Sequence, residues 1–344
     1  MALSILVVTL TAAGCTGGQL ASDPTIQGDG PELSIAFAGD VNFEDRAGEL
    51  LDKSPASAVG PVSGQLASAD LAIVNLETPV TTRGAAQQKR YLFRTDARAV
   101  NALKSAGVDL VSLANNHTLD YGRTGLADTM SAAARGGLGT VGAGVNASRA
   151  YAPWRTTIRG IRVSVLAFSQ VEDLADQWVA TPSRSGLAMA IDNRAALAAV
   201  RAARAASDVV IVVPHWGSEH NHCPTHVQQT FASELAKAGA DVILGSHAHV
   251  LQGQGYLGRT FVAYGMGNFL WGAGLLTPED WRGGVLKLTL RGRTVVQRNL
   301  IPTELSDDTR QPVEFASKEA DKERARVNQL RGCTSLERTP GPVS

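Results

Sequence analysis

The chain has 344 residues, of which 44% are hydrophobic, 19% are charged and 35 are glycine. This composition is that of a globular protein and excludes global disorder, and the length is sufficient for one large or two modest cores. Lysine plus arginine and aspartate plus glutamate both total 32, so the formal net charge is zero. No strongly basic surface is expected, which argues against nucleic acid as a partner.

The N-terminal segment has the features of a targeting sequence. Its apolar run of about ten residues is shorter than the ~20 that span a bilayer as a helix, but it suits the core of a signal peptide. Small residues lead into Cys15, which resembles the cleavage site of a bacterial lipoprotein. We predict a lipoprotein-type signal peptide over 1–14, lipidation of Cys15, a flexible tether over 15–31, and an extracytoplasmic, membrane-anchored protein. A plain N-terminal strand or helix is the alternative.

Two further cysteines, Cys223 and Cys333, form an even pair if Cys15 is lipidated and the protein lies in an oxidising compartment. One interpretation is a disulfide that ties the C-terminal tail, 306–344, to the domain; two free thiols are the other. The tail is rich in charged residues and proline, which predicts a partly helical or loose segment.

Short apolar runs alternate with alanine-rich segments along the middle of the chain. The runs predict buried strands at Leu33–Ala38, Leu71–Val74, Val108–Leu113, Val163–Phe168, Val209–Val213 and Val242–Leu244. Helices are predicted at Arg98–Ala106, Gly125–Ala134, Ala195–Ala206 and Val227–Ala238, and an antiparallel hairpin at Gly284–Leu290 and Arg293–Leu300. This alternation predicts an α/β fold with helices on both faces of the sheet. No linker divides 32–305, which we predict to be one domain.

Two carboxylates follow the first two strands. Asp40 comes directly after Gly39, and Glu77 ends the run that begins at Leu71. A carboxylate buried after an apolar run is costly unless a cation or hydrogen bonds compensate. We predict that both bind a metal; a turn former at Asp40 and a solvent-facing Glu77 are the alternatives.

The third strand leads into Asn115, Asn116 and His117, with Asp120 three residues on. An amide oxygen can complete a metal site while the neighbouring histidine approaches the reacting group. We therefore predict Asn116 as a metal ligand and His117 as catalytic. Asp120 can accept the second N–H of His117 and fix its tautomer. A turn with a structural histidine is the alternative.

Three histidines follow the later strands. His215 is presented at the end of a β-branched run, and His247 and His249 follow the strand at Val242–Leu244. Side chains two residues apart point to the same side of an extended segment, so both imidazoles are predicted to reach one metal centre. Glu219 can orient a ligand or contact substrate, or it is an exposed glutamate. Trp216 is expected to pack beneath the pocket. The remaining loop histidines are expected to face solvent or substrate and not to form a second metal cluster; these are His220, His222 and His226.

All of these motifs follow predicted strands, and ligands gather at the carboxyl ends of strands in open α/β sheets. Oxygen ligands mixed with imidazoles favour Zn²⁺, Mn²⁺ or Fe over Ca²⁺, and the absence of cysteine argues against a structural zinc site. The predicted ligands are Asp40, Glu77, Asn116, His215, His247 and His249.

Six segments in order carry a resemblance to a known family: Gly39–Val41, Asn75–Glu77, Asn115–His117, His215–Glu219, Gly245–His249 and Gly267–Phe269. Over roughly residues 33–290, the chain resembles the CapA-like capsule or poly-γ-glutamate synthesis proteins. That family is similar to calcineurin-like metallophosphoesterases. The resemblance implies a four-layer α/β/β/α sandwich with two divalent metal ions. It places Asp40 and His249 on one ion, Asn116, His215 and His247 on the other, Glu77 as the bridge and His117 near the substrate. Asn42 stands where that pattern has a metal-binding histidine, and Glu77 where it has an aspartate.

Further residues are predicted to contact the substrate. The basic segment Lys89–Arg94 can receive an anionic substrate, Arg94 in particular, or it is a solvated loop. Asn42 can contribute a weak contact. Asn268 can hydrogen-bond into the pocket from its glycine-rich turn, or this segment is a structural turn.

Two functions fit these features. The first is an envelope-anchored, metal-dependent hydrolase that acts on an anionic polymer or a phosphate ester in capsule or poly-γ-glutamate synthesis. The second is a non-catalytic polymer-binding or export component of a membrane capsule-assembly complex.

Overall fold

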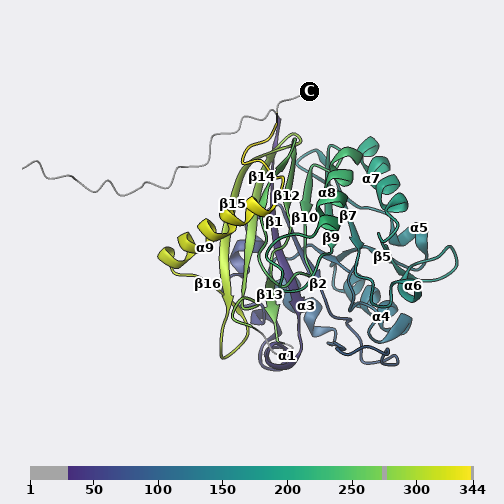
Figure 1. Cartoon of the computed structure of the whole chain (residues 1–344). Coiled ribbons are helices and arrows are strands. Elements are labelled where there is room, and N and C mark those ends of the chain that lie inside the picture. Colours follow the sequence, from purple (N-terminus) through teal and green to yellow (C-terminus); the bar gives the residue numbers. More distant parts are fainter. Residues whose placement is uncertain (1–29, 273–276, 342–344) are drawn as a thin grey trace, which may run out of the picture.

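A computed structural model describes residues 30–272 and 277–341. Two β-sheets pack face to face, and helices cover the outer face of each sheet (Figure 1). The predicted α/β class and the four-layer α/β/β/α sandwich are confirmed. The predicted signal peptide and Cys15 lie outside the described residues, as does most of the predicted tether. Among the described residues, no helix combines the length and apolar composition that a membrane span requires.

The first sheet has the strand order β16-β15-β14-β1-β2-β3-β4. Four of its strands run parallel: β1 (Glu32–Asn42), β2 (Leu71–Leu76), β3 (Leu110–Ser112) and β4 (Gly139–Val141). The antiparallel part is β14 (Arg282–Arg291), β15 (Thr294–Leu305) and β16 (Pro312–Glu314). The predicted hairpin is therefore confirmed as β14 and β15. The strand β13 (Asn268–Trp271) pairs in parallel with the last residues of β1.

The second sheet has the order β11-β12-β10-β9-β7-β6. Its strands are β6 (Trp154–Ile158), β7 (Ile161–Ser169), β9 (Val209–His215), β10 (Val242–Leu244), β11 (Gln254–Leu257) and β12 (Thr260–Ala263). The four strands β7, β9, β10 and β12 are parallel, so their carboxyl ends meet at one edge. A separate pair joins β5 (Ala143–Gly144) to β8 (Gly186–Leu187).

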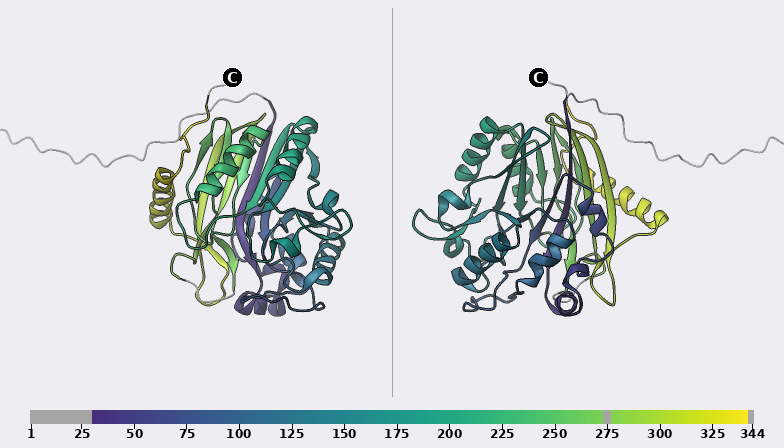
Figure 2. Two further views of the ribbon diagram at one scale, coloured as in Figure 1. Left: turned by 45° about the vertical axis from the view of Figure 1, so that its right-hand side comes forward. Right: turned by 180° about the vertical axis from the view of Figure 1, so that it is seen from behind.

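The helices form two groups, which Figure 2 shows from two further directions. Those on the first sheet are α1 (Asp45–Lys53), α2 (Ser63–Ala67), α3 (Arg98–Ser105) and α4 (Gly122–Arg135), with the 3₁₀ helix η1 (Pro55–Ser57). Those on the second are α5 (Ala147–Ala150), α7 (Arg194–Ala206) and α8 (His226–Ala238). The short α6 (Ala175–Trp178) packs beside α4. Each of the four predicted helices is present, with ends within three residues of those predicted.

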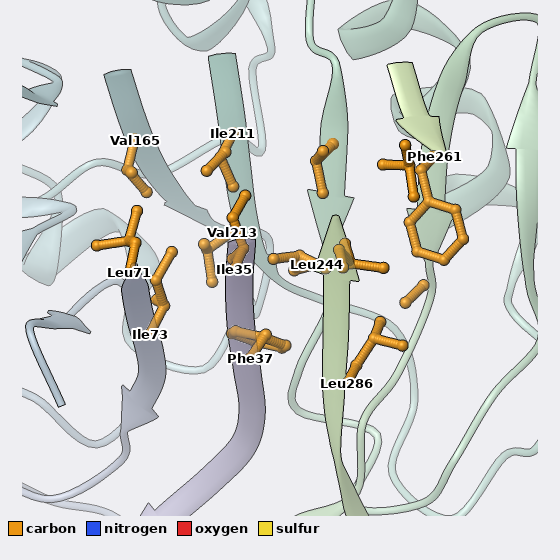
Figure 3. Packing of buried hydrophobic residues seen from close by; sticks show 14 of the residues in the cluster. Ile35, Phe37, Leu71, Ile73, Val165, Ile211, Val213, Leu244, Phe261 and Leu286 are labelled. Atoms are coloured by element: carbon orange, nitrogen blue, oxygen red, sulfur yellow. The ribbon is translucent and has the colours of Figure 1, made fainter. Parts of the chain in front are cut away.

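The strands are apolar on both faces, which explains why they appear in the sequence as continuous apolar runs. In β1, Ile35 and Phe37 point into the core between the sheets, whereas Ala36 and Ala38 face the helices. Figure 3 shows the central core, where Phe37 and residues of β2 lie opposite Ile211 and other residues of the second sheet.

The end of β1 is held by a close backbone contact. The amide of Asp40 donates a hydrogen bond to the carbonyl oxygen of Gly267 at 3.0 Å. A Cβ atom on Gly39 would lie 1.9 Å from the same oxygen, so only glycine allows the two segments to approach. This contact places Asp40 at the edge where the strand ends meet.

The C-terminal segment packs on the sheets. After β16, α9 (Ser317–Leu330) lies against β15 and β11, and the 3₁₀ helix η2 (Arg331–Cys333) follows. Cys333 forms a disulfide with Cys223, with Cα atoms 5.4 Å apart. Of the two interpretations of these cysteines, the structure has the disulfide. It joins the end of the chain to the loop that precedes α8.

Candidate metal centre

The predicted metal ligands converge where strand ends of the two sheets meet. Asp40 in β1, Glu77 after β2 and Asn116 after β3 come from the first sheet. His215 at the end of β9, with His247 and His249 after β10, comes from the second. All six side chains are buried. The site is thus formed by the packing of one sheet on the other.

Asp40 is hydrogen-bonded on both carboxylate oxygens. Its Oδ1 accepts from Asn75 Nδ2 at 2.8 Å, and its Oδ2 accepts from the backbone amide of His247 at 3.1 Å. The Nδ1 atom of His249 lies 3.4 Å from Oδ2. Asp40 therefore links the first sheet to the histidine-bearing turn of the second.

Glu77 is buried without full compensation. Its Oε1 lies 3.5 Å from His215 Nε2 but makes no hydrogen bond, and its Oε2 accepts a long one from Asn75 Nδ2 at 3.4 Å. Burial and the nearby charge of Asp40 raise the pKa of Glu77 well above its ordinary value. The carboxylate form of Glu77 needs a cation in this position.

His215 is held from three sides. Its Nε2 lies 2.8 Å from Asn116 Oδ1, and its Nδ1 lies 3.2 Å from both Ser246 Oγ and Asn75 Nδ2. The pKa of His215 is well below its ordinary value, mainly because the ring is buried and secondly because His247 is nearby. A neutral imidazole is the form that binds a metal.

His247 and His249 do not lie in an extended segment. Both have a positive φ, 88° and 56° respectively, and belong to an irregular turn after β10. The predicted extended geometry is therefore wrong. Left-handed backbone conformations are unfavourable for non-glycine residues and occur preferentially at functional sites. The turn still brings the two rings together, with centroids 5.9 Å apart.

The two imidazoles of this turn have different surroundings. The Nδ1 atom of His247 is buried without a hydrogen-bond partner, and burial lowers the pKa of its ring well below the ordinary value. The Nδ1 atom of His249 lies 2.9 Å from Asn268 Oδ1. Burial opposes protonation of His249, but its hydrogen bond to Asp40 and the charges of Glu77 and Asp40 prevail and raise its pKa to about 10.

Two groups of three side chains are close enough to hold a cation. One is Glu77, His247 and His249, and the other is Asp40, Glu77 and His215. Within each group the candidate ligand atoms lie within 4.8 Å of one another. These groups do not reproduce the division of ligands implied by the motif order, but both contain Glu77, the predicted bridge. Carboxylate oxygens and imidazole nitrogens are a donor set for Zn²⁺, Mn²⁺ or Fe, and the unpaired Glu77 Oε1 and His247 Nδ1 fit such an ion.

The predicted pair of His117 and Asp120 is present beside this cluster. His117 Nδ1 lies 2.7 Å from Asp120 Oδ2. Phe93 stacks on the imidazole with ring centroids 4.0 Å apart. Burial lowers the pKa of His117, opposed by its hydrogen bond to Asp120. These contacts restrict the ring to one orientation.

Of the residues predicted to contact the substrate, Asn268 contacts a candidate ligand, whereas the contacts described for the other three are made elsewhere. Asn268 lies in the site and accepts from His249, as described above. Asn42 Oδ1 instead accepts from the amide of Glu44 at 2.7 Å. The guanidinium of Arg94 lies 3.4 Å from the ring centroid of Tyr121. The side chain of Glu219 is 51% exposed and is 3.9 Å from His220 Nε2.

Trp216 packs in the interior, as expected. Trp216 is fully buried and donates from Nε1 to the carbonyl oxygen of Tyr264 at 2.8 Å. His220 Nδ1 lies 2.7 Å from Asp280 Oδ1. Within residues 30–272 and 277–341, no candidate metal group includes His220, His222 or His226.

The sequence did not predict the contacts of three further residues near the site. Asn75 in β2 contacts Asp40, Glu77 and His215, and it lies two residues before Glu77, a spacing that offered a signal. Asn115 orients its own turn through three hydrogen bonds to Oδ1, from His117 N, Thr118 N and Thr118 Oγ1. The burial of Lys89 against Asp120 had no local signal.

Two solved structures of other proteins align with this chain at low identity. A novel phosphatase from Mycoplasma pneumoniae aligns with a TM-score of 0.47 at 14% identity, covering 86% of this chain and 99% of that one. An NAD nucleotidase from Haemophilus influenzae aligns with a TM-score of 0.45 at 12% identity, covering 90% of this chain and 58% of that one. TM-scores and identities this low carry no argument about the fold, so the fold is assigned from the sheet order of this chain.

Sequence relatives are more informative. The capsule biosynthesis protein CapA of Bacillus anthracis is 27% identical over 323 residues, which cover 91% of this chain and 77% of that protein. The PGA biosynthesis protein CapA of Bacillus subtilis is 27% identical over 285 residues, covering 82% and 74%. The model of the bacterial capsule synthesis protein family PGA_cap matches residues 34–273, which include all six predicted metal ligands. The chain belongs to the PGA_cap family of bacterial capsule synthesis proteins.

Proposed function

We propose that this protein is a metal-dependent hydrolase that processes a phosphate ester or an anionic polymer during capsule or poly-γ-glutamate synthesis. The observation that carries the proposal is a pair of buried, unpaired ligand atoms, Glu77 Oε1 and His247 Nδ1, in one cluster. Buried polar atoms are almost always hydrogen-bonded, so two such exceptions in one cluster require an explanation. Coordination of two divalent ions, chosen among Mn, Zn and Fe, supplies one.

The charges of the cluster support the same conclusion. Asp40 and Glu77 are both buried, and they destabilise each other when both are ionised. A divalent ion would offset this repulsion, and neutral His215 and His247 can bind it through ring nitrogens. The Nδ1 atom of His249 is engaged by Asn268, so a cation would bind at Nε2, in place of the proton that the raised pKa of this ring keeps there in the absence of metal.

The chemistry would be divided between the ions and His117. When bound, divalent ions supply Lewis-acid activation of a phosphoryl or carbonyl oxygen and a nucleophile at neutral pH. Asp120 accepts from His117 Nδ1, so the lone pair of the neutral ring is on Nε2. That nitrogen can exchange a proton with the leaving group. The stacked Phe93 keeps the ring in place.

The substrate class is inferred from the relatives and from the chemistry of the site. The relatives from Bacillus anthracis and Bacillus subtilis are named for capsule and PGA biosynthesis. A cluster of metal ligands suits an anionic group, either a phosphate or a carboxylate of a polymer. We infer that such a group binds at the metals.

The test joins metal analysis to turnover. Purified protein loaded with Mn²⁺ or Zn²⁺ is assayed with p-nitrophenyl phosphate, bis-(p-nitrophenyl) phosphate and poly-γ-glutamate. We expect turnover of at least one substrate, and His247→Ala should abolish it. The matched control is His226→Ala, which removes an exposed histidine of α8. Less than one bound ion per chain would overturn the metal assignment.

Metal binding without turnover of any substrate would instead support a polymer-binding or export component of a capsule-assembly complex. Anchoring of the chain through Cys15 is a separate part of the proposal and rests on the sequence alone. Cys15→Ala is expected to move the protein from the membrane fraction to the soluble fraction of cells. An unchanged membrane fraction would contradict lipidation.

A further inference from the structure

Lys89 is buried beside the candidate site although it belongs to a strongly basic segment. Its side chain is only 7% exposed, and its Nζ lies 3.0 Å from Asp120 Oδ1 and also contacts the carbonyl oxygen of Asn116. A buried ammonium group is costly unless it is paired and hydrogen-bonded. These two partners of Lys89, together with His117 Nδ1 at 3.5 Å from Nζ, belong to the turn that carries the predicted ligand Asn116 and the pair of His117 and Asp120.

The surroundings of Nζ restrict it to this position. The ring centroid of Trp178 lies 5.1 Å from Nζ, and Asp173 Oδ2 lies 3.9 Å from it. Asp173 also accepts from Asn116 Nδ2 at 3.4 Å. Lys89 therefore joins the segment before β3 to the turn after β3 and to the loop before α6.

Asp120 is the centre of these contacts. Its Oδ1 accepts from Lys89, and its Oδ2 accepts from His117 Nδ1 at 2.7 Å and from the amide of Phe93 at 2.8 Å. The backbone carbonyl of Asp120 accepts from the amide of Gln87 at 2.9 Å. The segment on both sides of Lys89 is thus attached to Asp120, and the ammonium group occupies the remaining carboxylate oxygen.

We propose that Lys89 is a positioning residue that holds Asp120 and the Asn116 carbonyl in one arrangement, so that His117 keeps its Nδ1 proton directed at Asp120. The inference deepens the proposed hydrolase function and rests on it. It assigns to Lys89 a role different from receiving an anionic substrate, because its amino group is already engaged by a carboxylate and a carbonyl.

The neighbouring residue offers a matched control. Arg90 carries the same charge one position along the chain, but its side chain is exposed and stacks near Tyr91. A cation that attracts substrate through the general field of the loop would act from either position. A positioning role belongs to Lys89 alone.

The kinetic test compares Lys89→Met and Arg90→Met in the metal-loaded full chain with bis-(p-nitrophenyl) phosphate. Lys89→Met is expected to lower kcat by about 10- to 100-fold, the range found when partners of metal-site residues are removed, with KM changed less than about 2-fold. Metal content should stay at the wild-type value. Arg90→Met is expected to leave kcat and KM unchanged, and Lys89→Arg, which keeps N–H donors, should restore part of kcat.

A spectroscopic test is independent of turnover. In the zinc-loaded chain labelled with ¹⁵N-histidine, the wild-type signals of His117 should be those of the Nδ1-protonated tautomer. Lys89→Met should add signals of the other tautomer, while Lys89→Arg and Arg90→Met should match the wild type. If Lys89→Met does not fold, Lys89→Leu, which also lacks N–H donors, replaces it with the same expected results.

The outcomes separate the two proposals. Absence of turnover by the wild-type protein contradicts the hydrolase, whereas the nitrogen signals still decide the role of Lys89. A higher KM at unchanged kcat in Lys89→Met would assign Lys89 to substrate binding. Unchanged kcat together with unchanged His117 signals would leave it a structural residue. Either result overturns the inference.

Discussion

The Nε2 atom of His215, at the end of β9 in one sheet, lies 2.8 Å from Oδ1 of Asn116, which follows β3 in the other sheet. Neither sheet contains the complete candidate site. Asp40 makes a second connection of this kind through the amide of His247. Metal binding at this junction is therefore expected to stabilise the packing of one sheet on the other, since a site absent from the unfolded chain links binding to folding.

Metal should raise the melting temperature of the protein. Binding to the folded state alone adds about 2.7 kcal/mol when free metal is roughly 100-fold above Kd. For a domain of this size, that corresponds to an increase in Tm of about 4–5 °C. Calorimetry with Mn²⁺ or Zn²⁺, and again after EDTA, measures the shift. His215→Ala should lose the shift and His226→Ala should keep it. An equal shift in His215→Ala would show that the ion binds elsewhere.

Glu77→Gln should stabilise the metal-free protein at alkaline pH. The pKa of Glu77 is raised above its ordinary value of 4.5, so its contribution to stability is complete below that pH and is lost as the pH rises through the folded-state pKa. We expect the glutamine variant to gain about 1–3 kcal/mol at pH 8 in EDTA, and the gain to shrink toward pH 4.5.

Urea unfolding of both proteins across this pH range measures the difference in the free energy of unfolding. In the presence of metal the order should reverse, because the amide lacks the negative charge that the ion requires. A difference that does not change with pH would contradict the role given to ionisation of Glu77.

Loss of the disulfide should destabilise the chain. Cys223 and Cys333 are separated by 110 residues in the sequence, and closing a loop of this size is worth about 2–5 kcal/mol. The double variant Cys223→Ser, Cys333→Ser should unfold at a lower urea concentration than the oxidised wild type. Dithiothreitol should lower the wild-type midpoint and leave the variant unchanged. Equal midpoints for the oxidised wild type and the variant would contradict the prediction.

Gly39→Ala should destabilise the protein because its Cβ would lie 1.9 Å from the carbonyl oxygen of Gly267. Separation of the two backbones is expected to cost at least about 1–3 kcal/mol. Gly64→Ala in α2 is the matched control, since nothing lies within 4 Å of its added Cβ. In a helix that substitution should stabilise by about 0.5–1 kcal/mol. The urea midpoint of unfolding is expected to fall in Gly39→Ala and to rise in Gly64→Ala. An unchanged midpoint in Gly39→Ala would contradict the close approach of the two backbones.

The sequence by itself determined the elements of secondary structure and the positions of the candidate ligands along the chain. Continuous apolar runs predict strands buried on both faces, and Gly239, with φ of 110°, ends α8 as a C-terminal capping glycine does. Asp40, Glu77 and His215 were identified because each polar side chain follows such a run. These features depend on neighbours in the sequence, so local periodicity and backbone preference are sufficient to find them.

The tertiary structure alone decided how these residues meet. The left-handed conformations of His247 and His249 depend on a turn that β10 and Asp40 hold in place, and periodicity predicted an extended segment instead. The basic segment at Lys89 has the composition of a solvated loop, yet packing against Asp120 and Trp178 buries its ammonium group. Burial, hydrogen-bond partners and pKa shifts arise from contacts between distant residues, and those contacts exist only once the two sheets have packed.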